Sequence, residues 1–154
     1  MKTLITTLCI VYKHPKILLG MKKRGFATGK WNGFGGKVEA ETIEENVKRE
    51  TKEECGIEIK DIEKVGLMDF EFKDNPEVVQ VHIFRTENFS GDPIETDEMR
   101  PQWFHVDEIP FKEMWADDPF WIPLLLQGKK FKGKFLYEGH AKILEHEIEE
   151  VAQL

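Results

Sequence analysis

The segment from Gly36 to Ile57, GKVEAETIEENVKRETKEECGI, sets a glycine turn before a stretch dense in glutamate. Glu50, Glu53 and Glu54 recur at i, i+3 and i+4, which puts all three on one face of an α-helix. Like charges at that spacing destabilise an isolated helix by roughly 0.2–0.5 kcal/mol per pair. Crowded carboxylates are stable together when a hard divalent cation such as Mg²⁺ neutralises them. The spacing therefore favours a metal-binding helix over a solvated acidic helix.

The hydrophobic pattern of the remaining sequence predicts a mixed α/β fold. Extended segments are expected at Leu4–Tyr12, Ile17–Met21, Ile59–Phe72, Val78–Phe84 and Gln102–Val106, with one or two more strands between Phe135 and Val151. Helices are expected at Ile43–Glu54, ended by Gly56, and at Phe120–Gln127 after Pro119. The loop Lys22–Lys37 carries five glycines, which indicates backbone that approaches a ligand closely. One helix on each side of a mixed sheet would make an α/β/α sandwich.

Length and composition favour one domain spanning residues 1–154. The N-terminal run MKTLITTLCIVYKHPK has no small-residue cleavage site, so it is interpreted as a buried first strand and not as a signal peptide. No apolar run approaches the ~18–20 residues of a membrane span, so no membrane partner is expected. Only Cys9 and Cys55 are cysteines, which is typical of free thiols in a reducing compartment. We expect a cytoplasmic monomer.

The net charge of −7 argues against binding to a nucleic acid polymer, which requires basic surface. Most of this charge lies in one segment, because Glu39 to Glu58 contains eight glutamates and only three basic residues. An anionic substrate would be repelled there unless a cation reversed the local field. Phosphate chemistry at this helix therefore requires a metal ion.

The acidic segment resembles the Nudix box, G-x5-E-x7-R-E-U-x-E-E-x-G-U, in which U is aliphatic. The matching residues are Gly36, Glu41, Arg49, Glu50, Glu53, Glu54, Gly56 and Ile57. Two departures occur: only four residues separate Gly36 from Glu41, and Thr51 occupies an aliphatic position. The shorter loop costs little closure entropy but alters the turn, and the Thr51 hydroxyl is able to bond the i−4 carbonyl. The resemblance implies a Nudix-type α/β/α sandwich with the loop-helix-loop of that family.

The similarity extends from about Thr7 to Phe135. Five further segments resemble the MutT-type branch of the family that acts on oxidised purine nucleoside triphosphates: GMKKRGFATGKWNGFGGKV, VHIF, ETDEMRPQWF, IPFKEMW and DDPFWIPLLL. This branch converts small-molecule nucleotides such as 8-oxo-dGTP and 2-hydroxy-dATP to monophosphate and pyrophosphate, which sanitises the nucleotide pool and prevents mutation. The resemblance implies the same reaction here, with Mg²⁺ as cofactor and Mn²⁺ as a possible substitute.

The resemblance also implies roles at the phosphate end. The implied metal ligands are the backbone carbonyl near Gly35 and the side chains of Glu50, Glu53, Glu54 and Glu98. Glu50 is favoured as the base that activates water, although a metal-binding role remains open. Arg49 is expected to reach Glu53 at i+4 and orient the carboxylates. Lys22 is either a phosphate contact or a solvated loop lysine, and Lys23 and Arg24 are expected to be solvated.

At the base end, the resemblance implies substrate contacts by Thr7, Lys22, Phe26, Asn32, Phe70, Phe72, Met99, Trp115, Asp117 and Asp118. Trp115 offers a flat face for stacking a purine. Asp117 and Asp118 precede a proline and would otherwise be interpreted as a helix cap. In an apolar site the pair would share a proton, so that it donates to one oxidised purine and accepts from another. Phe70, Phe72 and Met99 are equally suited to the core, and Trp31, Trp103, Trp121 and His82 are expected to be structural.

Two alternatives remain open. A Nudix enzyme with another substrate, such as a sugar nucleotide or a dinucleoside polyphosphate, has the same box. A non-catalytic Nudix module would bind a nucleotide without cleaving it. The intact set of Arg49, Glu50, Glu53 and Glu54 argues against the module, since binding alone does not require every acid.

Overall fold

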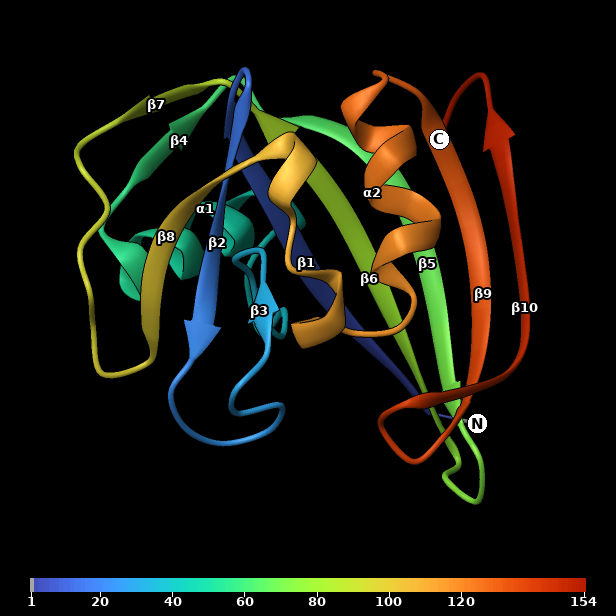
Figure 1. The fold of residues 1–154 in the computed structure, drawn as a ribbon. Helices are drawn as coiled ribbons and strands as arrows, with labels where there is room; N and C mark the ends of the chain where they lie inside the picture. Colours follow the sequence, from blue (N-terminus) through green and yellow to red (C-terminus); the bar gives the residue numbers. More distant parts are fainter. Residues whose placement is uncertain (1) are drawn as a thin grey trace.

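The structure is a computed structural model that describes residues 2–154, and these residues form ten strands and two α-helices (Figure 1). The strands are β1 (Lys2–Lys13), β2 (Lys16–Lys22), β3 (Trp31–Asn32), β4 (Glu58–Lys60), β5 (Glu63–Phe72), β6 (Glu77–Thr86), β7 (Asn88–Ser90), β8 (Met99–His105), β9 (Lys130–Glu138) and β10 (Lys142–Val151). The helices are α1 (Ile43–Cys55) and α2 (Asp118–Leu126), with short 3-10 turns at Val106–Glu108 and Phe111–Glu113. Neither α-helix is long and apolar enough to cross a membrane.

Eight strands form one mixed sheet in the order β10-β9-β5-β6-β1-β2-β3, with β8 also paired to β2. β1 runs parallel to β6 and β5 runs parallel to β9, whereas the other pairs in this sheet are antiparallel. β4 and β7 form a separate two-stranded sheet. The predicted mixed sheet is confirmed.

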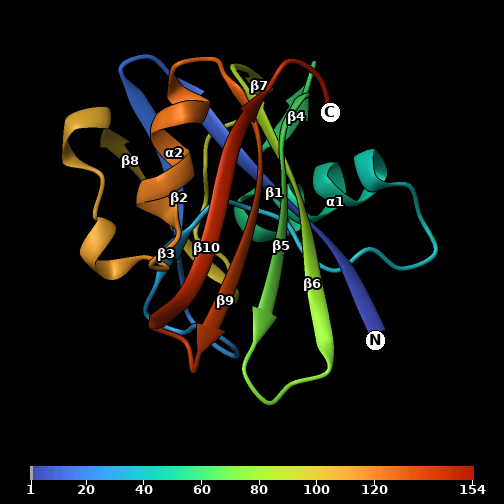
Figure 2. The same ribbon diagram turned by 90° about the vertical axis from the view of Figure 1, so that its right-hand side faces the viewer.

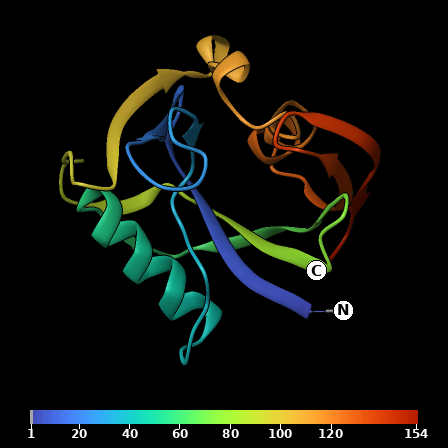
Figure 3. The ribbon, with the colours of Figure 1, turned by 90° about the horizontal axis from the view of Figure 1, so that it is seen from below.

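The two helices cover opposite faces of the sheet (Figures 2 and 3). Successive side chains of a strand point to opposite faces, so β1 supplies both cores. Cys9 belongs to the apolar cluster that contains Val47 of α1. Ile10 belongs to the cluster that contains Trp121 of α2. This arrangement confirms the predicted α/β/α sandwich, and it places α1 beside the middle of β1, where the glycine-rich loop pairs with Thr6 and Cys9.

Local sequence explains both ends of α1. Thr42 is the N-cap, and it forms a capping box with Glu45 in which each side chain accepts from the other residue's backbone N–H. Gly56 ends the helix in the left-handed conformation at φ 79°, as predicted. The Thr51 hydroxyl donates to the Val47 carbonyl at 2.7 Å, so the buried polar atom of this box departure is satisfied within the helix.

Several predicted boundaries were wrong where tertiary pairing decides them. β8 begins at Met99 and not at Gln102, because its pairing with β2 continues to Lys22. The segment predicted as one extended stretch from Ile59 divides into β4 and β5 around Asp61, whose φ is 48°. The glycine-rich loop also contains the short strand β3, held by pairing with β2.

The C-terminal half shows similar corrections. α2 begins at Asp118 and ends at Leu126, earlier than the predicted Phe120–Gln127. One or two strands were expected in the tail, and two are present, the first of which begins at Lys130 and not at Phe135. β10 forms one edge of the sheet, and the turn that joins it to β9 contributes Gly139 and His140 to the lining of the cavity described below.

Candidate active site

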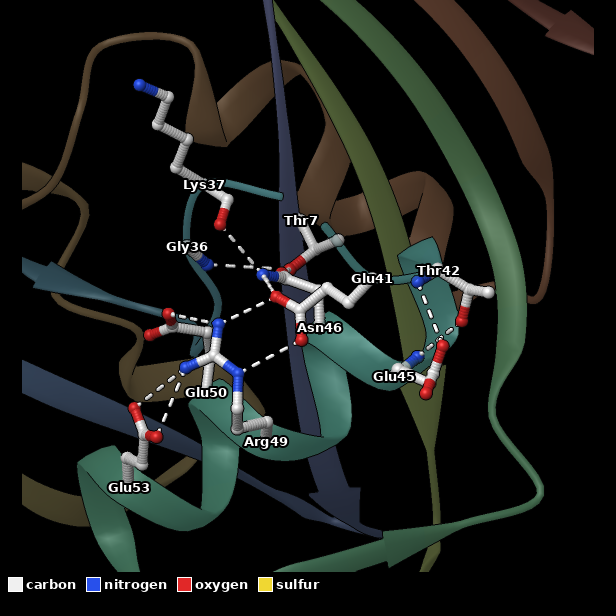
Figure 4. Close-up of polar contacts among 10 residues, drawn as sticks. All are labelled: Thr7, Gly36, Lys37, Glu41, Thr42, Glu45, Asn46, Arg49, Glu50 and Glu53. Carbon is white, nitrogen blue, oxygen red and sulfur yellow. Dashed lines mark hydrogen bonds and ion pairs between the residues drawn. The ribbon is translucent and has the colours of Figure 1, made fainter. Parts of the chain in front are cut away.

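Arg49 contacts several carboxylates on the acidic face of α1 (Figure 4). Its guanidinium donates to both carboxylate oxygens of Glu41, at 3.0 and 2.7 Å, and to both of Glu53, at 3.1 and 3.0 Å. Its Nη2 also lies 3.2 Å from Glu50. The predicted Arg49–Glu53 contact is confirmed, while the bidentate pair with Glu41 was not anticipated. The Arg49 guanidinium therefore holds three carboxylates together.

Glu54 is the buried acid of this face. Its side chain turns toward the loop, where Oε1 accepts from the Gly35 backbone N–H at 2.9 Å. Burial raises the pKa of Glu54 to about 8, the Gly35 hydrogen bond opposes this rise, and the charge of Glu50 adds to it. Burial likewise raises the pKa of Glu50, against the influence of Arg49. These two acids are costly to ionise side by side, and a cation between them would remove that cost.

The glycines of the loop allow it to pack directly on these acids. A Cβ at Gly36 would lie 2.6 Å from the Glu50 carboxyl carbon, and one at Gly35 would overlap the Thr7 carbonyl. Only glycine fits at either place without moving β1 or Glu50. The Gly35 and Gly36 backbone therefore sets the positions of Glu50 and Glu54.

The donor set fits a hard divalent cation, because Glu50, Glu54 and the backbone near Gly35 offer only oxygen. In the described part of the chain, however, no three Asp, Glu, His or Cys side chains converge closely enough to hold a metal ion. Glu53 is engaged by Arg49, and Glu98 is paired with Arg24 at 2.7 Å. The structure thus brings Glu50 and Glu54 together with the loop. Glu50 and Glu53 are also paired with Arg49, and Glu98 with Arg24, and these ion pairs would be exchanged to bind metal.

A cavity of about 850 Å³, a size suited to a small-molecule ligand, borders this helix and loop. Its lining includes Gly35, Gly36 and, of the acids described above, Glu54. Every residue predicted to contact substrate lines the same cavity: Thr7, Lys22, Phe26, Asn32, Phe70, Phe72, Met99, Trp115, Asp117 and Asp118. Asn32 has its side-chain oxygen held by the Gly33 N–H at 2.9 Å. The fold therefore joins the box and the predicted base pocket in one continuous space.

Aromatic rings form the wall of the far end. The Trp115 ring lies 5.5 Å from Phe26 and 6.4 Å from Phe72, centroid to centroid. His140, from the β9–β10 turn, lies 4.7 Å from Phe26 and 5.8 Å from Trp115 and also lines the cavity. Lys30 Nζ stands 5.7 Å from the Trp115 ring centroid. His140 and Lys30 were missed: Lys30 lies in a segment that carries the resemblance but was given no role, and only the folded turn brings His140 to Trp115.

The two aspartates have different surroundings. Asp117 accepts from the Tyr137 hydroxyl and from the Trp121 indole N–H, at 2.5 and 2.9 Å, and makes no side-chain cap bond. The helix-cap interpretation is therefore wrong. Asp118 is 2% exposed, and its Oδ2 is a buried oxygen without a hydrogen-bond partner among residues 2–154. Burial raises the pKa of both carboxyls, and the charge of Asp117 raises that of Asp118 further.

The other predicted residues lie as follows. Lys22 lines the cavity, and its charge lowers the pKa of Glu54, so it faces the site. Lys23 and Arg24, expected to be solvated, form surface ion pairs with Glu95 and Glu98 at 2.6 and 2.7 Å. His82 bonds Gln80 through Nε2 at 3.0 Å, but Nδ1 has no partner in the described chain, so it is only partly satisfied.

A mixed sheet between two helices, with an acidic helix behind a glycine loop and an aromatic cavity in front, defines a nucleotide-handling Nudix fold. The NUDIX domain family matches residues 2–125, and the chain belongs to the Nudix family. It is 53% identical over 151 residues to the zebrafish (Danio rerio) oxidized purine nucleoside triphosphate hydrolase, covering 97% of each chain. It is 52% identical over 146 residues to the mouse (Mus musculus) protein of that name, covering 94% of each. The crystal structure of the Bacillus halodurans mutator MutT protein is similar with a TM-score of 0.85 and 30% identity, over 95% of this chain and 97% of that one.

Proposed function

We propose that this protein hydrolyses oxidised purine nucleoside triphosphates, such as 8-oxo-dGTP and 2-hydroxy-dATP, to monophosphate and pyrophosphate. The observation that carries the proposal is the free Oδ2 of Asp118, buried in a cavity that leads to Glu54. A buried polar atom without a partner is costly unless a ligand satisfies it. The two vertebrate relatives named for this activity match nearly the whole chain, which supports the same substrate class.

Recognition of the base rests on Asp118. Because its pKa is raised, its carboxyl keeps a proton at a higher pH than an exposed aspartate does. A protonated carboxyl donates a hydrogen bond and an ionised one only accepts, so one side chain serves either oxidised purine. Asp117 remains fixed by Tyr137 and Trp121 and holds the next residue in place. Trp115 and Phe26 supply the stacking surface.

Hydrolysis takes place at the α1 end. Nudix hydrolases generally need a divalent cation, and we propose Mg²⁺, with Mn²⁺ as a substitute. When bound, it would neutralise phosphate charge for in-line phosphoryl transfer. The cation would be held by Glu50, Glu54 and the Gly35 carbonyl. Glu53 and Glu98 would also bind it once their ion pairs with Arg49 and Arg24 are broken. Glu50 accepts the proton of the attacking water, Arg49 orients the carboxylates, and Lys22 contacts the phosphates.

We further propose that the protein acts as a cytoplasmic monomer on free nucleotides and not on nucleic acid polymers. The net charge of −7 would repel a phosphate polymer, whereas a single nucleotide needs only the local cation. Both cysteines are buried and free, in keeping with a reducing compartment. Size-exclusion chromatography with light scattering measures the oligomeric state directly.

The test is a panel of initial rates with Mg²⁺, following pyrophosphate release and separating the products by chromatography. The panel contains 8-oxo-dGTP, 2-hydroxy-dATP, dGTP, dATP, a sugar nucleotide and a dinucleoside polyphosphate. We expect the highest kcat/KM for the two oxidised purines, with monophosphate as the second product. A higher kcat/KM for the sugar nucleotide or the dinucleoside polyphosphate would favour another Nudix activity. Tight binding without turnover would favour the non-catalytic module.

A further inference from the structure

The side chain of Asn46 lies fully buried on α1, and its amide oxygen and both of its N–H donors form hydrogen bonds (Figure 4). Its Oδ1 accepts from the Thr7 hydroxyl of β1 at 2.5 Å. Its Nδ2 donates to the Lys37 carbonyl at 2.8 Å and to Glu41 Oε1 at 2.7 Å. An amide has two N–H donors, and here both are engaged. One side chain thus joins a strand, the loop and the helix.

One arm of this network reaches the loop that positions the acids. Thr7 accepts from the Gly36 N–H through its hydroxyl at 3.4 Å, and its own backbone N–H donates to the Gly36 carbonyl at 2.9 Å. Asn46 fixes the next residue through the Lys37 carbonyl. Gly36 lies against Glu50, and the neighbouring Gly35 donates to Glu54. A shift of this loop would therefore move both acids.

The other arm reaches the charged face. Glu41 accepts from Asn46 and from two nitrogens of Arg49. Arg49 continues to Glu53 and lies 3.2 Å from Glu50. Asn46 therefore fixes one carboxylate oxygen of the residue that anchors Arg49. Both sets of contacts lead from the Asn46 amide to the acids of the site. The contacts through the loop reach Glu50 and Glu54, and those through Glu41 and Arg49 reach Glu50.

We propose that Asn46 is a positioning residue, which couples the Gly35–Lys37 loop to the Glu41–Arg49 pair and so holds Glu50 and Glu54 ready for a divalent cation. The inference deepens the proposed function and rests on it for the reaction, but not for cation binding. A buried amide is costly to desolvate and is favourable only when its whole network is satisfied.

The test compares Asn46→Ala with Thr51→Val as a matched control. Thr51→Val also removes one buried hydrogen bond of α1, but that bond ends on the Val47 carbonyl and not on the loop. Three quantities are measured: Tm, the Kd for Mn²⁺ without nucleotide by water-proton relaxation, and kcat and KM at saturating Mg²⁺. Residues that hydrogen-bond metal ligands typically change metal affinity or activity by about 10–100-fold.

For Asn46→Ala we expect Mn²⁺ affinity and kcat each to fall by about tenfold or more, with the nucleotide KM within about twofold. Thr51→Val should lower Tm while leaving the Mn²⁺ Kd and kcat within about twofold of wild type. Should Asn46→Ala lower Tm alone, or should both variants lose Mn²⁺ affinity in step with Tm, Asn46 is only a packing residue and the proposal is overturned.

A second variant covers the case in which Asn46→Ala does not fold. Asn46→Ser retains a short polar group but does not span the gap to Glu41, so it should reproduce the loss of Mn²⁺ affinity. Combining it with Glu41→Gln should give less than the product of the two single losses, because both act through Arg49. Independent, multiplicative losses would contradict the coupling. If oxidised nucleotides are not the substrate, the Mn²⁺ comparison still decides the inference, and a wild-type protein that binds no Mn²⁺ overturns it.

Discussion

Asp117 and Tyr137 exchange two hydrogen bonds. The backbone N–H of Asp117 donates to the Tyr137 hydroxyl at 2.9 Å, and that hydroxyl donates to the Asp117 carboxylate. The second carboxylate oxygen accepts from the Trp121 indole at 2.9 Å. Both oxygens of Asp117 are thus engaged within the protein, while Oδ2 of the adjacent Asp118 is not engaged by any residue from 2 to 154. The two neighbours differ in proposed role: Asp117 builds the site and Asp118 contacts the base.

Asp117→Asn should therefore act mainly on stability. An asparagine offers one oxygen to two donors, so either Tyr137 or Trp121 faces an NH₂ group. We expect the free energy of unfolding to fall by about 1–3 kcal/mol, the cost of an unpaired buried polar group. The loss in kcat/KM should be similar for 8-oxo-dGTP and 2-hydroxy-dATP. Urea unfolding and initial rates measure both, and Tyr137→Phe, which removes one hydroxyl, is the matched control. Unchanged stability with loss on a single substrate would contradict this role.

Asp118→Asn should stabilise the free protein in a pH-dependent way. The pKa of Asp118 is raised in the folded state, so the folded protein binds this proton more tightly than the unfolded chain, whose aspartate pKa is about 3.9. The stability of the wild type therefore decreases as pH rises from about 4 toward the folded pKa. Asparagine does not ionise, so the Tm of the variant relative to wild type should rise with pH over that range. A Tm difference that is constant from about pH 4.5 to about pH 7.5 would refute the argument.

The same substitution should alter substrate preference. The asparagine side chain would always present both a donor and an acceptor and would not switch between them, so one oxidised purine should lose a hydrogen bond. A loss of about 1–3 kcal/mol corresponds to roughly 5–150-fold in relative kcat/KM. The dependence on Mg²⁺ should stay unchanged, because Asp118 belongs to α2 and not to the acidic helix α1. Asp107→Asn, at an exposed carboxyl, is the control. Changes within about twofold for both substrates would exclude Asp118 from base recognition.

Local patterns predicted the elements of the fold well where one segment decides its own structure. The periodicity of α1 and the glycine after it gave nearly its full length, and Gly56 ends the helix in the left-handed conformation. Predictions were poorer where a partner strand decides. β3 is two residues long and exists through pairing with β2, and β8 extends to Met99 for the same reason. Neither partner is visible in a local window of sequence.

The prediction of the candidate site was likewise good in one respect and poor in another. The resemblance to the family selected positions that line the cavity, including Asn32 and Trp115, because a residue that matches a family motif occupies the same place in the fold. It gave no account of contacts made between distant segments. Thr7 meets Asn46 across 39 positions, and Asp117 meets Tyr137 across 20. The capping interpretation of Asp117 was wrong because its carboxylate accepts from two side chains, the Tyr137 hydroxyl of β9 and the Trp121 indole of α2, and from no backbone N–H of the helix start.

Glu54→Gln should abolish turnover. It keeps the shape of the buried side chain and an acceptor for the Gly35 N–H, but removes the charge that a cation needs. We expect kcat to fall by at least about 10²-fold and the Kd for Mn²⁺ to rise, with the folded structure retained. Glu53→Gln should also reduce turnover, and it would remove a carboxylate partner of Arg49. Glu50→Gln should reduce turnover while leaving nucleotide binding largely intact. Glu58→Gln, at an exposed ion pair with Lys52, is the control. Near-normal turnover of Glu54→Gln at physiological Mg²⁺ would overturn its assignment as a metal ligand.

His140→Ala tests whether the β9–β10 turn contributes to the base pocket. The imidazole packs edge-on against Phe26 at 4.7 Å and lies 5.8 Å from Trp115, so it holds the exposed Phe26 ring over the cavity. Aromatic pairs of this kind are worth about 0.5–1.5 kcal/mol beyond area burial, which corresponds to roughly 2–12-fold in KM. We expect KM to rise by that factor with kcat nearly constant, since the contacts of His140 are with the aromatic rings of the cavity. His140→Phe should restore KM by restoring the ring.

His146→Ala is the control, because His146 also packs on aromatic rings, those of Phe120 and Phe135, outside the cavity lining. Equal effects of the two alanine variants, or a fall in kcat alone, would show that His140 does not act through the base pocket.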